Sequence, residues 1–382
     1  MFQFKKLHVM ALATFLFTFA GIIGANSEIH ASNSDQFVKS PVPEVIKKYV
    51  NSINNKDWDS YVNLYSPDNR LTDFPGEEQQ KNRTGILSVD SIEISEIKEI
   101  SEKDINEIQP YFSDIDRGLY QDIKYFYIGL DYNVQNENEF FYNGVRYQSF
   151  AVGKLNGVEY ILGNEFVYEF DKLETLGYTF DSAAEYEAII REERRLGGND
   201  NPLNSGGIQP QSSTNPTNGL TLYITSTKTL KTLGFDDYAK DVLPNEWYAS
   251  MKSEALKAGA VAIKSYAWYN VTYPRRPATD FGAHLTDKWE NYQHYVPGKR
   301  HVNTNAAVDS VSGIFMRNSD GVVFDTQYRA GTEGQPGTES GGVLSQHGTQ
   351  YLATNYPLWN YKAILGYYYN FSDKSSGYIQ VR

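Results

Sequence analysis

The stretch that most constrains the fold of this chain is residues 196–219. It reads LGGNDNPLNSGGIQPQSSTNPTNG and consists mostly of Gly, Pro, Ser and Asn, with almost no apolar side chain. This composition is typical of a flexible connector, because it offers little apolar surface to bury. The chain has 382 residues, more than the roughly 100–200 usual for one domain. We therefore predict two domains, at 32–195 and 220–382, joined by a linker at 196–219.

The first 31 residues have the pattern of an export signal. Two lysines, Lys5 and Lys6, precede an apolar run from about Val9 to Ile23, and small residues follow at Ala25 and Ala31. We expect a signal peptide at 1–31, and hence a protein secreted across the membrane and associated with the cell wall. The alternative, a retained membrane anchor, is disfavoured because the run is short of the roughly 20 apolar residues that span a bilayer.

Charge and cysteine content exclude several classes of protein. Residues 32–198 carry 31 Asp and Glu against 17 Lys and Arg, a net charge of −14, whereas residues 199–382 are nearly neutral. Nucleic-acid binding needs clustered cations, so this class is set aside. The chain has no cysteine, which excludes disulfides, thiolate metal sites and lipid attachment at cysteine.

The predicted first domain combines helices with a curved antiparallel sheet. Apolar residues recur with a helical period at 45–53 and again at 58–65. Three later segments, at 123–135, 139–157 and 158–170, alternate aromatic or β-branched residues with polar ones, and Asn-Gly pairs divide them. The order resembles the cone-shaped nuclear-transport-factor-like fold, in which the sheet wraps a pocket. Such a domain could bind a ligand, but an accessory role as a spacer or partner-docking module is favoured, because residues 32–195 contain no histidine and no compact set of acids, bases or metal ligands. A charged closing helix, EYEAIIREERRLGG, is expected to have a solvated face.

The predicted second domain contains the residues suited to chemistry. The segment SEALKAGAVAIKSYAWYN is expected to form a buried helix, whose Ala and Gly residues allow another backbone to approach closely. Ser253 is expected to cap this helix, and Glu254 to complement its dipole. Pro244 is expected to interrupt the helix before it, leaving Glu246 in a bend beside Trp247 and Tyr248.

This region resembles the stage II sporulation protein D family (SpoIID/LytB type), in which a glutamate precedes a helix reading roughly EALKAQAVAARSYA. The resemblance continues in the family's order through YQHY, NTNAAVDSVSGIFM, DGVVFDTQYRAGTEG, SQHGTQYLA and YKAILGYYY, and covers about residues 219–374. The chain departs from the family at Gly259, where Gln is usual, at Lys264, where Arg is common, and at Ser340, where a histidine stands. These departures concern ligand contacts more than the fold, and both domains are expected to be of the α+β class.

The resemblance implies a lytic transglycosylase that cleaves peptidoglycan glycan strands between N-acetylmuramic acid and N-acetylglucosamine, with Glu246 as the single acid/base. The sugar's own 6-hydroxyl replaces water, so the second carboxylate of an ordinary glycosidase is not required. Four residues match family positions and are expected to bond acetamido and hydroxyl groups of the glycan: Tyr292, Gln293, Ser345 and Gln346. The aromatic face of Tyr328 is expected to stack on a sugar. For each of the five, a structural hydrogen bond is an equal alternative.

Two other functions remain open. The chain could be a non-catalytic wall-binding protein that stimulates a cell-wall amidase, a role also attached to this family. It could instead be a hydrolytic glycosidase that uses Asp280, Asp287 or Glu290 as the second carboxylate. No cofactor and no metal are predicted. A zinc site formed by histidines alone, from His284, His294 and His301, is a less favoured alternative. The sequence does not predict the oligomeric state.

Overall fold

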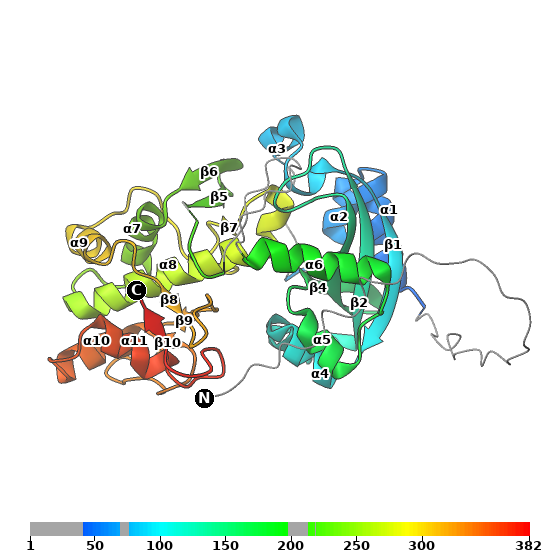
Figure 1. Ribbon diagram of the computed structural model, residues 1–382. Helices are drawn as coiled ribbons and strands as arrows, with labels where there is room; N and C mark the ends of the chain where they lie inside the picture. The colour runs from blue at the N-terminus through cyan, green and yellow to red at the C-terminus, as the bar shows by residue number, and fades with distance from the viewer. Residues whose placement is uncertain (1–40, 69–75, 198–212, 218) are drawn as a thin grey trace, which may run out of the picture. The chain divides into compact units, whose positions relative to one another are not determined.

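The computed structural model describes residues 41–68, 76–197, 213–217 and 219–382 (Figure 1). Residues 40–382 belong to one compact unit that mixes helices and sheets, which confirms the α+β class. The predicted signal peptide lies outside the described residues, as does most of the predicted linker. The division into two domains stays a prediction, and we refer below to an N-terminal half (41–197) and a C-terminal half (213–382).

The N-terminal half is built around four long strands, each hydrogen-bonded to the next in chain order and antiparallel to it. The strands are β1 (Val89–Ile100), β2 (Gln121–Val134), β3 (Gly144–Leu155) and β4 (Val158–Phe166). The helices are α1 (Glu44–Asn54), α2 (Trp58–Asn63), α3 (Glu77–Asn82), α4 (Glu102–Ile108), α5 (Phe170–Leu176) and α6 (Ala183–Gly197), with short 3₁₀ helices η1 (Gly85–Ser88) and η2 (Pro110–Asp114).

The sheet is covered on both faces, which explains why its strands are rich in aromatic residues. Along β2, Tyr125 and Tyr127 pack into one apolar cluster, whereas Phe126 and Ile128 pack into the other. Successive side chains of a strand point to opposite faces, so both sets are buried at once. The second turn, Asn156-Gly157, has positive φ at both residues, as the Asn-Gly signal predicts.

The charged helix α6 has more buried charged residues than the sequence indicates. Tyr142 donates to Glu192, which is buried and also pairs with Arg195. Glu185, at the other end of α6, is buried as well and accepts from Tyr127. The expected solvated face is therefore wrong for these residues, because buried tyrosine hydroxyls and an arginine compensate their charge.

The C-terminal half is mainly helical, with short strands. Its helices are α7 (Phe235–Glu246), α8 (Ser253–Thr272), η3 (Ala278–Phe281), α9 (Val302–Ser310), α10 (Gln346–Asn355) and α11 (Tyr361–Tyr369). Its strands are β5 (Leu220–Ile224), β6 (Thr229–Leu233), β7 (Leu285–Thr286), β8 (Met316–Arg317), β9 (Tyr328–Arg329), β10 (Leu344–Ser345) and β11 (Gln380–Val381). β5 pairs with β6 in antiparallel and with β7 in parallel orientation.

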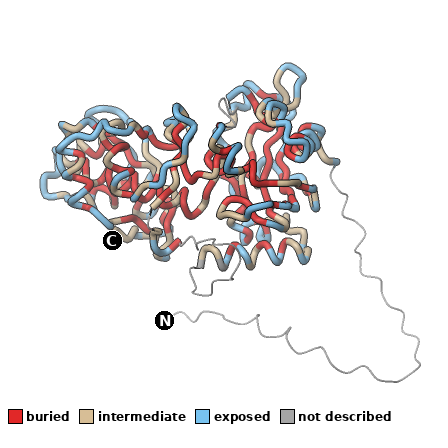
Figure 2. Tube along the Cα trace, turned by 90° about the horizontal axis from the view of Figure 1, so that it is seen from above, coloured by how far each residue is buried: buried red, intermediate tan, exposed pale blue. Residues whose placement is uncertain are grey.

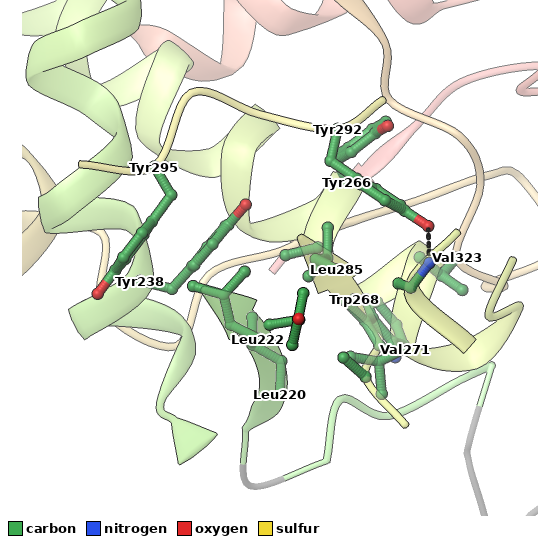
Figure 3. Close-up of a cluster of buried hydrophobic side chains, with 14 of the residues drawn as sticks. Leu220, Leu222, Tyr238, Tyr266, Trp268, Val271, Leu285, Tyr292, Tyr295 and Val323 are labelled. Atoms are coloured by element: carbon green, nitrogen blue, oxygen red, sulfur yellow. Dashed lines mark hydrogen bonds between the residues drawn. The ribbon is translucent and has the colours of Figure 1, made fainter. Parts of the chain in front are cut away.

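Helix α8 is the centre of this half, as predicted. It contacts α7, α9, α10 and α11, and nearly all of its residues are buried. A helix that is apolar on all sides must be buried on all sides. Figure 3 shows part of this buried cluster, with Trp268 and Val271 of α8 among its members. Ser253 does not cap the helix, since Lys252 occupies that position without a side-chain bond. Glu254 has a structural role, because it accepts the Tyr361 N–H.

Buried residues of both halves belong to one apolar cluster, and Figure 2 shows buried residues in red in both halves. Arg276 belongs to the C-terminal half, pairs with Asp280, and donates to Asn164 on β4 at 2.8 Å. Its guanidinium group also lies 3.7 Å from the ring centroid of Tyr65. An arginine with both a carboxylate and aromatic faces as partners is well compensated for burial. No helix within the described ranges is both long and apolar enough to cross a membrane.

Candidate active site

Glu246 is the last residue of α7 rather than part of a bend, so the expected helix break at Pro244 is wrong. The proline lies in the last turn, where it removes only one backbone donor. The helix bonds around it persist, because Trp247 N–H donates to the Leu243 carbonyl and the Asn245 side chain donates to the Asp241 carbonyl.

Two neutral donors hold the half-buried carboxylate of Glu246. The main-chain N–H of His294 donates to Oε1 at 2.9 Å, and the side-chain amide of Gln346 donates to Oε2 at 2.9 Å. Within the described residues, no lysine, arginine or histidine forms an ion pair with Glu246. Both carboxylate oxygens are thus oriented without a neutralising cation.

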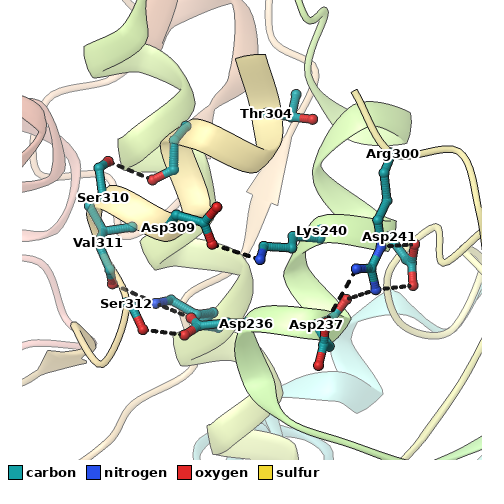
Figure 4. A network of polar contacts seen from close by, with 12 residues as sticks. Asp236, Asp237, Lys240, Asp241, Arg300, Thr304, Asp309, Ser310, Val311 and Ser312 are labelled. Carbon is teal, nitrogen blue, oxygen red and sulfur yellow. Dashed lines mark hydrogen bonds and ion pairs between the residues drawn. The ribbon is translucent and has the colours of Figure 1, made fainter. Parts of the chain in front are cut away.

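The segment that follows His294 is attached to α7 by Asp241, five residues before Glu246, and Figure 4 shows Asp241 bonded to Arg300. The Asp241 carboxylate accepts from Arg300 Nε at 2.8 Å and from Gly298 N–H at 3.3 Å. Burial opposes its charge, but the Arg300 guanidinium and the Gly298 N–H lower the pKa of Asp241 below the usual range. These bonds attach residues 296–300 to α7. They thereby hold the neighbouring His294 N–H close to Glu246 on the same helix.

One face of α10 is attached to the chain around Glu246. Gln346 bonds Glu246, Thr349 accepts from Trp247 Nε1 at 3.1 Å, and Gln350 accepts from Lys252 N–H at 2.7 Å. Residues three and four apart lie on the same side of a helix, so these three side chains form one row. The row places Gln346 at Oε2 of Glu246, whereas His294 donates to Oε1.

Aromatic residues form the surroundings of Glu246. Trp247 is fully buried, and its ring lies 5.0 Å from that of Tyr328. Burial, and then the nearby Glu246 carboxylate, raise the pKa of Tyr328, so its hydroxyl stays protonated at neutral pH. Tyr248 is 68 % exposed and lies beside the His347 ring. The carboxylate therefore has a buried aromatic wall on one side and an exposed ring next to it.

The departure from the family at Gly259 has a clear structural reason. A Cβ built there would meet the Trp247 ring at 2.8 Å and Leu243 at 3.1 Å. The contact with the Trp247 ring is shorter than a real Cβ makes, so glycine at this position makes room for Trp247 against α8. Lys264, another departure, is fully buried, pairs with Asp236 at 2.8 Å and donates to the Val311 carbonyl.

The five expected substrate contacts have different surroundings. Gln346 touches Glu246, and Gln293 donates to the Tyr328 hydroxyl at 3.0 Å, so these three are grouped around the carboxylate. The hydroxyl of Tyr292 bonds the Arg275 carbonyl, and that of Ser345 accepts from Gly348 N–H at the start of α10. Tyr292 and Ser345 therefore bond main-chain groups, whereas Gln346 bonds Glu246 itself and Gln293 bonds Tyr328.

The histidines are separate from one another in their contacts. His284 lies between Thr221 N–H and Glu139, and the His301 side chain caps α9. His294 contributes its main-chain N–H to Glu246. In the part of the chain that the structure describes, no three His, Asp or Glu side chains are grouped as metal ligands.

The carboxylates weighed as a second catalytic acid have other partners. Asp280 is buried against Arg276 and the Tyr61 hydroxyl, and Asp287 accepts both the N–H and the hydroxyl of Thr225. Glu290 is exposed and lines a cavity. Neither Asp280 nor Asp287 is free to assist Glu246.

That cavity, of about 560 Å³, lies where β4 and η2 meet the residues just before His294. Gln293 and Tyr328, which belong to the surroundings of Glu246, also line it, as does Glu165 on β4. Burial raises the pKa of Glu165 to about 7, against the opposing effect of Arg275 and Arg276. The sequence analysis did not identify Glu165, whose one signal was a carboxylate within an aromatic strand.

Comparison with known proteins adds one match. The family described as stage II sporulation protein (SpoIID) matches residues 223–317, a segment that includes Glu246, the whole of α8 and Gln293. No curated protein matches the chain. The match confirms the resemblance to this family for this segment. The segment that contains Glu246, α8 and the His294 donor thus carries a stage II sporulation protein (SpoIID) domain match, whereas the second donor, Gln346, lies outside it.

Proposed function

We propose that this protein is a lytic transglycosylase that cleaves peptidoglycan glycan strands between N-acetylmuramic acid and N-acetylglucosamine. The observation that carries the proposal is the single carboxylate of Glu246, held by two neutral donors beside a wall of Trp247 and Tyr328. A one-carboxylate reaction needs an acid that is positioned but not neutralised by a cation, and Glu246 satisfies both conditions.

Glu246 alone can carry out both proton transfers of this reaction. The protonated carboxyl group gives its proton to the glycosidic oxygen, and the bond from that oxygen to C1 of the muramoyl residue breaks. The resulting carboxylate then takes the proton of the C6 hydroxyl, whose oxygen forms the new bond to C1. The product is a 1,6-anhydromuramoyl end, the acid is regenerated, and no water is consumed. General acid–base assistance of this kind contributes roughly 10²–10⁴-fold.

Mass spectrometry of digested glycan strands tests the proposal. We expect anhydro ends with the wild-type protein, and a loss of at least about 100-fold in their rate of formation for Glu246→Gln. The matched control is Glu254→Gln, which changes a carboxylate of the same region that bonds Tyr361 and Lys257 instead. Reducing ends in place of anhydro ends would identify a hydrolase.

The second candidate function is a non-catalytic enhancer of a cell-wall amidase. The exposed rings of Tyr248 and Trp289 favour it, since a glycan-binding surface alone would suffice for that role. In that case no glycan fragments form, whereas adding the protein to a purified amidase speeds release of stem peptides. We further propose an extracytoplasmic location, which fractionation of cells expressing the full chain would test.

A further inference from the structure

The turn between α10 and α11 exposes large apolar side chains. Leu358 is 95 % exposed and Tyr356 is 45 % exposed. The Tyr356 ring stacks on that of Trp359, with centroids 4.8 Å apart, and the Trp359 N–H donates to the Tyr356 carbonyl at 2.8 Å. On its other side Trp359 lies next to Tyr367 of α11, at 6.2 Å between centroids. We call residues 356–359 the aromatic turn, a surface whose rings already hold one another in place.

The surroundings of the aromatic turn are polar but bring little charge. Residues 340–361 contain no Lys, Arg, Asp or Glu. Asn355 and Asn360, on either side of the turn, are exposed and carry amide groups. Glu254, which bonds the start of α11, is paired with Lys257 at 2.7 Å. The turn therefore suits a partner that offers C–H groups to the rings and hydroxyl or amide groups to the rim.

Helix α10 connects this turn to the Glu246 carboxylate. Gln346, at the start of the helix, donates to Glu246. Gln350, one turn further, donates to the hydroxyl of Thr354 at 3.2 Å, and Thr354 is exposed. Residues four apart lie on one side of a helix, so these neutral groups form a row that leads from Glu246 towards the turn. The ten residues of α10 extend about 15 Å, so the turn lies within reach of a polymer bound at Glu246.

We propose that the aromatic turn is a second binding site for the glycan strand, where it holds N-acetylated sugars several sugars away from the bond that Glu246 acts on. The inference rests on the proposed function. A sugar ring has a face of C–H groups, whose partial positive charge matches the negative face of an aromatic ring. Its hydroxyl and acetamido groups bond the amides at the rim. The aromatic turn lies outside the segment matched by the family, which ends at residue 317.

Two other occupants fit the aromatic turn less well. Peripheral binding to anionic membranes draws on clustered Lys and Arg, and residues 340–361 have neither. A stable protein interface buries about 800 Å² on each partner. Among residues 340–361, all of which the structure describes, only Tyr356 and Leu358 are large, apolar and exposed. A stacked pair of rings is small for a protein partner but matches the face of a sugar.

Steady-state kinetics on peptide-free glycan strands of two lengths test the inference. Long strands reach both Glu246 and the aromatic turn, whereas tetrasaccharides reach only Glu246. Trp359→Ala and Tyr356→Ala should each raise KM for long strands roughly fivefold to tenfold, as for one lost stacking contact. Both should leave kcat and the tetrasaccharide KM unchanged. The control Tyr186→Ala removes an exposed tyrosine of α6 and should change neither KM.

Binding separates failure of this inference from failure of the proposed function. The Glu246→Gln protein is titrated by calorimetry with a hexamer of N-acetylglucosamine, with and without Tyr356→Ala. Weaker binding in the double variant supports the inference even if no strand yields anhydro ends. Equal hexamer binding, or a KM for long strands that neither variant raises, overturns it while leaving glycan cleavage standing.

Two controls complete the experiment. Circular dichroism checks the fold of each variant, and if Trp359→Ala does not fold, the exposed Tyr356→Ala decides alone. Vesicles of phosphatidylglycerol test the membrane as the occupant. Vesicle binding that Tyr356→Ala abolishes would assign the aromatic turn to a lipid surface and overturn the inference.

Discussion

Replacing Glu165 by Gln should stabilise the protein, and should do so only above mildly acidic pH. Burial raises the pKa of this carboxyl from the ordinary value of 4.5 to about 7. In the unfolded chain the group titrates near its ordinary value, so between pH 4.5 and 7 the folded state binds more protons than the unfolded state. Stability therefore falls as pH rises through this window. At about 1.4 kcal/mol per pH unit, the total fall is about 3 kcal/mol.

Glutamine keeps the shape of the side chain and cannot ionise, so it removes this fall. We expect Glu165→Gln to match the wild type near pH 4.5 and to exceed it by up to about 3 kcal/mol at pH 8. Urea unfolding at several pH values measures the difference directly, and Asp131→Asn serves as the exposed control. A difference that is constant with pH, or a variant less stable than the wild type at pH 8, would refute the argument.

Three further variants have definite expected outcomes. Glu246→Gln should lose anhydro-end formation. It should also lose about 1 kcal/mol of stability, because one of the two donors to the carboxylate would then face an amide NH₂. A variant that still cuts glycan would exclude the catalytic role. Gly259→Ala should destabilise by about 1–3 kcal/mol in thermal unfolding despite the better helix propensity of Ala, because Trp247 has no room to move; a higher Tm would contradict that packing. Arg276→Ala should lower the free energy of unfolding by about 3–5 kcal/mol, because it leaves Asp280 buried without a cation. A loss under 1 kcal/mol in urea unfolding would show that water reaches Asp280.

Much of the fold could be predicted because periodicity reports burial directly. The sequence indicated α1, α2, α8 and the last three strands of the sheet. Strand β1 was missed, since its sequence VDSIEISEIKEI carries charges on the exposed face that obscure the apolar alternation. The helix end at Pro244 was wrong because a proline in the last turn interrupts too few bonds to stop a helix.

The candidate site was only partly predictable. The motif identified Glu246, but its donors come from residues 48 and 100 positions away in sequence, and no local pattern reports such a pairing. Glu165 was missed for the same reason, because the burial that raises its pKa, against the opposing effect of Arg275 and Arg276, comes from residues distant in sequence. Periodicity describes one element at a time, whereas a site depends on how several elements meet.

The contacts of Arg276 also bear on how such a chain can change by recombination. Its partners Tyr65 and Asn164 are encoded more than 100 positions upstream. If a related catalytic segment were exchanged into this protein, it would have to bring an arginine or an equally suited group to the same place. An exchange that introduced an apolar residue there would remove one of the donors to Asn164, and it would leave Asp280 buried without its cation. Chimeras joined near residue 219 should therefore fold well only when both parents share this arginine.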